Sequence, residues 1–132
     1  MCIFCKIVAG EIPARKIYED ENTLAFLDVA NDCYGHILVI PKTHCENMFD
    51  ISKADASHFM ETVRRVMAHI KALGFEGANI VNNNGEIANQ KVLHLHFHIF
   101  PREGEKAGPF ERYYPQNIQR DFDAEHKLFK MN

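Results

Sequence analysis

The segment Lys91-Val-Leu-His-Leu-His-Phe-His-Ile-Phe100 is the most informative part of the chain, because it alternates apolar residues with three histidines. Alternate residues of a β-strand point to the same face, so an extended conformation places three imidazoles on one side. These are His94, His96 and His98, and the intervening Leu93, Leu95, Phe97 and Ile99 are expected to face a core. At about 3.3 Å per residue, neighbouring histidines lie roughly 6.6 Å apart. One metal ion reaches two such rings but not easily three, so the row is expected to serve more than one purpose.

Outward from this segment, short apolar and β-branched runs lie on both sides of one helix. The helix is predicted over residues 53–73, because Phe59, Val63, Val66, Ile70 and Leu73 recur at helical spacing. Ser52 is its expected cap and Gly74 its stop, and its His58 and His69 fall off the apolar stripe and are expected in solvent. The predicted strands are residues 15–19, 23–28, 36–41, 77–83 and 91–100. This order predicts an α+β fold with antiparallel hairpins on both sides of the helix.

Composition limits the function classes. The chain has 132 residues, 46% of them hydrophobic and 25% charged, which is typical of a single globular domain. A net charge of −3, mixed along the chain, makes bulk nucleic-acid binding an unexpected function. No apolar run approaches the roughly 20 residues of a membrane span. Residues 1–6 lack the pattern of a secretory signal, so a cytoplasmic location is expected.

Three interpretations of the histidine row remain. A solvated strand face is one, and a histidine pair for a catalytic metal is another, although no carboxylate lies near the row in sequence. The third is covalent catalysis at phosphorus, in which one neutral imidazole attacks and its neighbours donate protons. We favour the third.

Residues 94–100 resemble the His-φ-His-φ-His-φ-φ signature of the histidine triad (HIT) nucleotide hydrolases and transferases, where φ is hydrophobic. Further stretches look like the Hint branch and its bacterial members: Cys2-Ile-Phe-Cys5, Gly10-Glu-Ile-Pro13, Tyr18-Glu-Asp20, Ala25-Phe-Leu-Asp28, Gly35-His36 and Ile40-Pro-Lys-x-His44. The resemblance covers residues 2–102. It implies the HIT-like fold, with about five antiparallel strands, one long helix and a short N-terminal helix.

The resemblance also implies residue roles. His96 would attack the α-phosphorus of a purine nucleotide and form a nucleotidyl-histidine that water hydrolyses. His98 and His36 would flank the phosphate, with Asn83 and Gln90 as further polar contacts. Asp28 would bind the ribose hydroxyls. The walls of the base cleft would be Ile3, Phe4, Ile7, Phe26 and Val29, although a plain core role is an alternative for Ile7 and Val29.

One departure from the Hint pattern affects substrate choice. Many members carry a serine where this chain has Lys91, which supplies a mobile cation in place of a hydroxyl. The first expectation is therefore hydrolysis of nucleoside 5′-phosphoramidates or related nucleotidyl conjugates. A dinucleoside polyphosphate hydrolase is the alternative, and a nucleotide-sensing or interaction protein with weak turnover is a third.

Cys2 and Cys5 form a Cys-x-x-Cys pair, which in a reducing compartment indicates a metal clip or a redox pair. No thioredoxin-like βαβ pattern surrounds it. Zinc-bearing bacterial relatives use the positions that match Cys2, Cys5, His44 and His94, so the resemblance implies a structural Zn²⁺. The alternative is that His44 and His94 hydrogen-bond to each other beside free thiols.

The remaining residues, 103–132, are predicted to be a tail on a single domain with its core at residues 1–102. Some of its aromatic residues are expected at an interface: Phe110, Tyr113, Tyr114, Phe122 and Phe129. The resemblance implies a homodimer.

Overall fold

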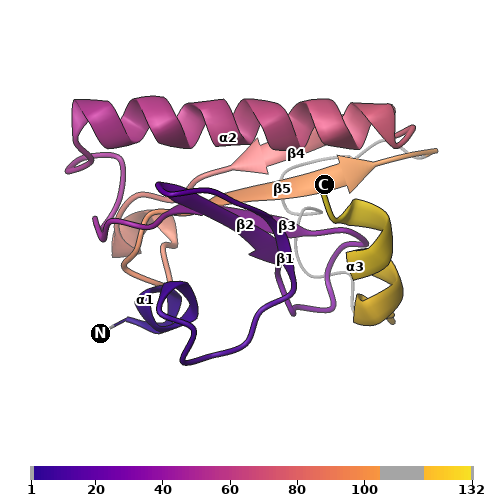
Figure 1. Ribbon diagram of the computed structural model, residues 1–132, viewed down its shortest axis with the longest axis horizontal. Helices are drawn as coiled ribbons and strands as arrows, with labels where there is room; N and C mark the ends of the chain where they lie inside the picture. The colour runs from indigo at the N-terminus through magenta and orange to yellow at the C-terminus, as the bar shows by residue number, and fades with distance from the viewer. Residues whose placement is uncertain (1, 105–117, 132) are drawn as a thin grey trace.

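The computed structural model describes residues 2–104 and 118–131, which form a single five-stranded sheet with three α-helices packed around it (Figure 1). The sheet is antiparallel throughout, in the order β1-β2-β3-β5-β4. The strands are β1 (Lys16–Glu19), β2 (Thr23–Leu27), β3 (Ile37–Pro41), β4 (Gly77–Val81) and β5 (Phe97–Arg102). The helices are α1 (Ile3–Val8), α2 (Lys53–Ala72) and α3 (Phe122–Phe129), with a 3-10 turn, η1, at Glu86–Ala88. The predicted α+β fold is confirmed.

The long helix α2 lies along one face of the sheet (Figure 1). Its N-terminus is capped by the Ser52 hydroxyl, which accepts from the Asp55 amide. The periodic apolar residues of the helix pack on the alternate strand residues that point toward it, including Ala25, Val39 and Ile99. Within the part of the chain that the structure describes, no helix is long and apolar enough to cross a membrane.

The opposite face of the sheet is only partly covered. There α1 packs on Leu24, Phe26, Leu38 and Ile40 through its buried Phe4 and Ile7. Beyond α1 the same face carries His98, because Leu38 and His98 are directly opposed in the β3–β5 pair. Polar side chains therefore gather beside α1, on the face that α2 leaves open.

The strand predicted at residues 91–100 begins only at Phe97 and runs on to Arg102. Its first half leaves the sheet because the Leu95 amide donates to the Cys45 carbonyl (2.9 Å) and His94 Nε2 donates to the Pro41 carbonyl (2.8 Å). The expectation that Leu93 faces the core is wrong, since it is 41% exposed. The other three residues predicted to face the core, Leu95, Phe97 and Ile99, are buried.

The described C-terminal residues, 118–131, include a helix that packs on the core. Asp121 caps α3, and Phe129 is fully buried in the same core as α2, so Phe129 is not one of the aromatic residues available for an interface. The ring of His69 donates to the Phe129 carbonyl (2.7 Å), which corrects the expectation that His69 is free in solvent. Phe122 lies under the guanidinium groups of Arg15 and Arg120. The other three aromatic residues named for an interface, Phe110, Tyr113 and Tyr114, lie outside the described residues.

Candidate active site

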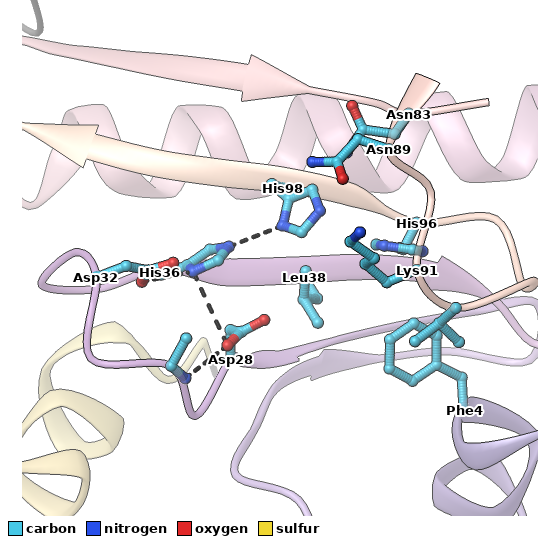
Figure 2. Close-up of a pocket in the computed structure, with 12 residues that line it drawn as sticks. Phe4, Asp28, Asp32, His36, Leu38, Asn83, Asn89, Lys91, His96 and His98 are labelled. Carbon is cyan, nitrogen blue, oxygen red and sulfur yellow. Dashed lines mark hydrogen bonds and ion pairs between the residues drawn. The ribbon is translucent and has the colours of Figure 1, made fainter. Parts of the chain in front are cut away.

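A pocket of about 390 Å³ opens on the face of the sheet opposite α2 (Figure 2). This volume is in the range of small-molecule sites. Its lining comes from α1, the loop between β2 and β3, β3, the loop after β4, and the segment that enters β5. The lining residues are Phe4, Asp28, Ala30, Asp32, His36, Leu38, Asn83, Asn89, Lys91, Val92, His96 and His98.

His96 is oriented by a hydrogen bond and a ring contact. Its Nδ1 donates to the His94 carbonyl (2.7 Å), and a carbonyl oxygen only accepts, so the proton of the neutral ring lies on Nδ1. The edge of the ring packs against Phe4, with 5.1 Å between centroids. Asn82 donates to the His96 carbonyl (3.1 Å) and fixes the backbone. The Nε2 lone pair is therefore left for chemistry.

His36 and His98 meet at the other end of the pocket. His36 Nε2 lies 3.0 Å from His98 Nδ1, and His36 Nδ1 lies 2.9 Å from Asp32 Oδ1. The His36 ring stacks on Phe100 at a centroid distance of 4.3 Å, which fixes its plane. The His98 ring stands edge-on to His96, 4.9 Å away. The three side chains thus form a continuous polar chain from Asp32 to the pocket.

The histidines of the row favour the neutral form. Burial lowers the pKa of His94 and of His96. Burial, together with the neighbouring rings of His36 and His96, lowers the pKa of His98 to about 3. At neutral pH these rings can offer both a lone pair and an N–H, which is what proton transfer and nucleophilic attack require.

Asp28 follows β2 and begins the loop that leads to His36. Its Oδ1 accepts from the Ala30 amide (2.7 Å), so the carboxylate is oriented by its own loop. The same oxygen is 4.0 Å from His36 Nδ1. In Figure 2 the second oxygen of Asp28 points into the pocket beneath His98 and Lys91. The carboxylate retains acceptor capacity for a polar ligand.

Cys2, Cys5, His44 and His94 form a compact cluster next to the pocket. The two sulfurs are 3.2 Å apart, the two Nδ1 atoms 3.1 Å apart, and the four sulfur–nitrogen distances run from 3.3 to 3.7 Å. A tetrahedral zinc ion with Zn–S of about 2.3 Å and Zn–N of about 2.0–2.1 Å separates its ligand atoms by roughly 3.3–3.8 Å. Because His94 Nε2 donates to the Pro41 carbonyl, its Nδ1 is the bare nitrogen and faces the cluster. The donor set fits a metal ion.

The structure places some predicted site residues away from the pocket. Gln90 is buried and bound by four hydrogen bonds, to Asn47, Gly85, Glu46 and Val92, so it braces the loop instead of reaching a ligand. Ile7 and Phe26 belong to the apolar cluster under α1. Ile3 and Val29 are 49% and 71% exposed and do not line the pocket. Of the predicted pocket residues Phe4, Asp28, His36, Asn83, Lys91, His96 and His98 do line it.

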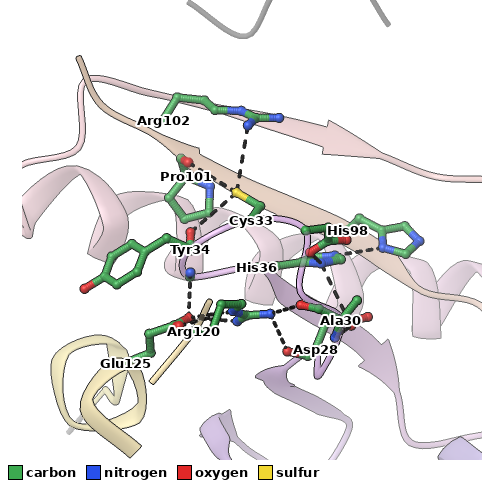
Figure 3. Close-up of polar contacts among 12 residues, drawn as sticks. Asp28, Ala30, Cys33, Tyr34, His36, His98, Pro101, Arg102, Arg120 and Glu125 are labelled. Carbon is green, nitrogen blue, oxygen red and sulfur yellow. Dashed lines mark hydrogen bonds and ion pairs between the residues drawn. The ribbon is translucent and has the colours of Figure 1, made fainter. Parts of the chain in front are cut away.

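A C-terminal clamp, which we define as Arg120 and Glu125, holds the loop from Asp28 to His36 (Figure 3). Both side chains are essentially inaccessible and form a salt bridge of 2.7 Å. Arg120 Nη1 donates to the carbonyls of Asp28 (2.9 Å) and Ala30, and Glu125 accepts from the Gly35 amide (2.7 Å). The clamp therefore fixes the loop that carries Asp28, Asp32 and His36.

Sequence reasoning missed this clamp and Asp32. A short helix beginning after Asp121 was readable, because Phe122, Glu125 and Phe129 recur at helical spacing behind a capping residue. Which part of the sheet that helix covers was not readable. Asp32 gave no signal, since it lies in an irregular loop and acts only through contact with His36.

Comparison with known proteins identifies the class. The model of the HIT domain matches residues 9–105. Protein hit of Bacillus subtilis is 50% identical over 127 residues, which cover 89% of this chain and 87% of that protein. An adenosine 5′-monophosphoramidase of Saccharomyces cerevisiae is 40% identical over 129 residues, covering 98% and 78%. A Zn-bound histidine triad family protein of Mycobacterium smegmatis superposes with a TM-score of 0.85 at 34% identity, covering 98% of this chain and 90% of that one.

The fold and the histidine-lined pocket are those of a HIT protein, and the chain belongs to the HIT family. The bacterial Hit protein and monophosphoramidases among its relatives confirm the predicted branch and the expectation of a HIT-family enzyme.

Proposed function

We propose that this protein hydrolyses nucleoside 5′-phosphoramidates or related nucleotidyl conjugates through a nucleotidyl-His96 intermediate. The observation that carries the proposal is the hydrogen bond from His96 Nδ1 to the His94 carbonyl, which leaves Nε2 as a lone pair in the pocket. A neutral imidazole held in one tautomer is a suitable nucleophile for phosphorus. Relatives named adenosine 5′-monophosphoramidase support the choice of substrate.

The surrounding residues suit the rest of a nucleotide. The oriented carboxylate of Asp28 can accept from two ribose hydroxyls. His98 is next to His96, and His36 is next to His98. If His96 attacks the α-phosphorus, these two rings would be the neighbours of the phosphate oxygens. Asn83 and Asn89 line the opposite rim and add amide donors. Phe4 and Leu38 supply apolar surface for a base.

Lys91 favours a second substrate class. It is exposed and lines the pocket beside His96 and His98, where a Hint-type serine is replaced by a cation (Figure 2). An ammonium group stabilises a departing polyphosphate more than a departing amine. Dinucleoside polyphosphates are therefore the alternative substrate.

We further propose that the cluster of Cys2, Cys5, His44 and His94 holds a structural Zn²⁺. The closed set of four ligands leaves no position for a substrate, so the ion would supply cross-linking and not Lewis-acid chemistry. The ring of His94 belongs to this cluster, and its carbonyl accepts a hydrogen bond from His96. The cluster thus anchors the group that orients the nucleophile.

A homodimer is also proposed. Strand β4 lies at one edge of the sheet, and its Ile80 is 43% exposed. Light scattering on the purified protein checks this expectation, and a mass of one chain at micromolar concentration contradicts it.

The experiment that tests the function compares two substrates and two proteins. Wild type and His96→Ala are given a purine nucleoside 5′-phosphoramidate and a dinucleoside tetraphosphate, in buffer without a chelator. Preference for the phosphoramidate, lost in His96→Ala, is the expected result. His58→Ala is the matched control, since His58 is an exposed histidine of α2 and its loss leaves turnover unchanged.

The other outcomes are equally informative. Preference for the polyphosphate, reduced by Lys91→Ser, moves the protein to the alternative substrate. Binding of both without turnover contradicts the enzymatic proposal and favours a nucleotide sensor.

A further inference from the structure

Asp32 is a buried carboxylate that the proposed reaction has so far left without a role. It is 4% exposed, lies in the loop between β2 and β3, and contacts His36 Nδ1 at 2.9 Å. An ionised carboxylate only accepts hydrogen bonds, so His36 Nδ1 carries a proton. The contact therefore fixes which nitrogen of His36 is left to face His98.

The next contact transmits this choice to the pocket. His36 Nε2 and His98 Nδ1 are 3.0 Å apart, and the stacked ring of Phe100 keeps His36 in plane. Two ring nitrogens at this distance share one proton. The second nitrogen of His98 faces the side of the pocket where His96 and Lys91 lie (Figure 2).

Two proton arrangements satisfy these contacts, and they differ in what His98 presents to a substrate. If His36 is neutral, His98 Nδ1 donates to it, and His98 offers a bare Nε2. If His36 is an imidazolium, it donates to His98 Nδ1, and His98 offers an Nε2–H. The carboxylate of Asp32, with that of Asp28 at 4.0 Å, stabilises the imidazolium.

We propose that Asp32 is a positioning residue that, through His36, makes His98 a proton donor to the leaving group. As His96 Nε2 forms its bond to phosphorus, the bond from phosphorus to the leaving nitrogen breaks and its electron pair stays on that nitrogen. His98 Nε2–H gives the nitrogen its proton, and His98 Nδ1 takes one from His36 Nε2. His36 becomes neutral while keeping Nδ1–H on Asp32, and the positive charge ends on nucleotidyl-His96.

The role of Asp32 rests on the proposed function, because it requires that His96 forms the covalent intermediate. Removing the charge with little change of shape gives the variant Asp32→Asn. Two probes differ in their need for a proton. The adenosine 5′-phosphoramidate of an alkyl amine needs one on its leaving nitrogen, whereas the 4-nitrophenyl ester of AMP releases a phenolate that leaves unprotonated. The rate of nucleotidyl-enzyme formation is measured in single turnover with each.

Asp32→Asn should slow the amine substrate by about 100-fold, the low end of what a positioned acid contributes, and the nitrophenyl ester by less than about threefold. KM should change little with either probe, and Asp32→Glu should recover part of the rate with the amine. Asp123→Asn is the control, because it removes one exposed carboxylate of α3 that does not line the pocket. An equal loss on both probes, or no loss on either, overturns the proposal.

A second measurement needs no variant. Nitrogen-15 NMR of the imidazoles in wild type should find the proton of His98 on Nε2, and a proton on Nδ1 of His98 overturns the proposal. The His96→Ala variant distinguishes the two ways of failing. If the proposed function is wrong, His96→Ala reacts as fast as wild type with both probes. If only the role of Asp32 is wrong, His96→Ala is inactive.

Discussion

The two ends of the pocket are held in place by different means. At one end, His94 and the backbone of His96 are fixed by a cluster of two cysteines and two histidines that joins α1 to the loops around it. At the other end, the loop that carries Asp28, Asp32 and His36 is fixed by Arg120 and Glu125, which arrive from the C-terminal segment. The end near His94 depends on four potential metal ligands, and the end near His36 depends on the buried ion pair.

The difference shows how stability is divided across the site. A metal cluster adds stability only while the ion is bound, so the end near His94 is sensitive to chelation. A buried ion pair adds little net stability, but the removal of one partner leaves the other charge desolvated. The two ends should therefore respond to different perturbations, and the following predictions separate them.

Arg120→Met should have the largest effect, because it leaves the carboxylate of Glu125 buried and the carbonyls of Asp28 and Ala30 without their donor. The free energy of unfolding should fall by about 3–5 kcal/mol. Equilibrium unfolding in urea measures this. Arg15→Met is the control: its partner Asp123 is exposed, and the loss should be below about 1 kcal/mol. Equal losses in the two variants would contradict a distinct role for the clamp.

Zinc removal tests the other end. A chelator should lower the free energy of unfolding of the wild type by about 3–4 kcal/mol, as expected for a ligand present at several hundred times its dissociation constant or more. Cys5→Ser should be unstable from the start and insensitive to the chelator. Cys45→Ala should keep the wild-type response, because Cys45 adjoins His44 but lies outside the cluster. If the free energy of unfolding of the wild type does not change with the chelator, the protein holds no structural ion.

Gly35→Ala should destabilise the loop end by about 3 kcal/mol. Gly35 has a φ of +75°, and an added Cβ would lie 2.3 Å from the Phe129 ring. Gly10→Ala is the matched control, with a φ of +80° and nothing within 4 Å, so it should cost only the backbone strain of about 1 kcal/mol. The double variant Gly35→Ala with Phe129→Leu should recover part of the difference. A Gly35→Ala loss no greater than that of Gly10→Ala would mean that Phe129 does not pack there.

The smallest effect is a change in the slope of stability with pH. The pKa of His98 is about 3 in the folded protein and about 6.5 when unfolded, so the unfolded state binds more protons between these values. The contribution of His98 to the free energy of unfolding is fully present above pH 6.5. It decreases as the pH falls, by at most about 1.4 kcal/mol per pH unit. His98→Asn should flatten the slope between pH 4 and 6 by about one proton, and exposed His58→Asn should not. An unchanged slope in His98→Asn contradicts the burial of a neutral ring.

Much of the fold could be predicted from local sequence patterns. The spacing of Phe59, Val63, Val66 and Ile70 predicts α2 to within one residue at its C-terminal end. Short apolar runs predict β2 and β3, but both strands are buried along their whole length, so their sequences do not show which residues face α2. The failure at β5 has a local cause that alternation cannot show: the Leu95 amide pairs with Cys45, which draws the first half of the segment out of the sheet.

The residues at one end of the pocket could be predicted from the sequence, and the clamp at the other end could not. Cys2, Cys5, His44 and His94 were predictable as a group because the resemblance supplied the partners of a short cysteine spacing. The clamp was not, since Glu125 meets Gly35 across 90 positions of sequence and neither residue type signals the other. Gln90 was misplaced because an amide beside a pocket and an amide bracing its loop have the same sequence pattern.

The covalent bond between His96 and the nucleotide can be observed directly. Rapid quenching of wild type with excess purine nucleoside 5′-phosphoramidate, followed by mass spectrometry of the peptide that contains residues 91–102, tests it directly. We expect a nucleotidyl group on His96 that appears at least as fast as turnover and is missing in His96→Ala. Turnover in wild type with no labelled peptide at any quench time, or equal turnover in His96→Ala, would contradict it.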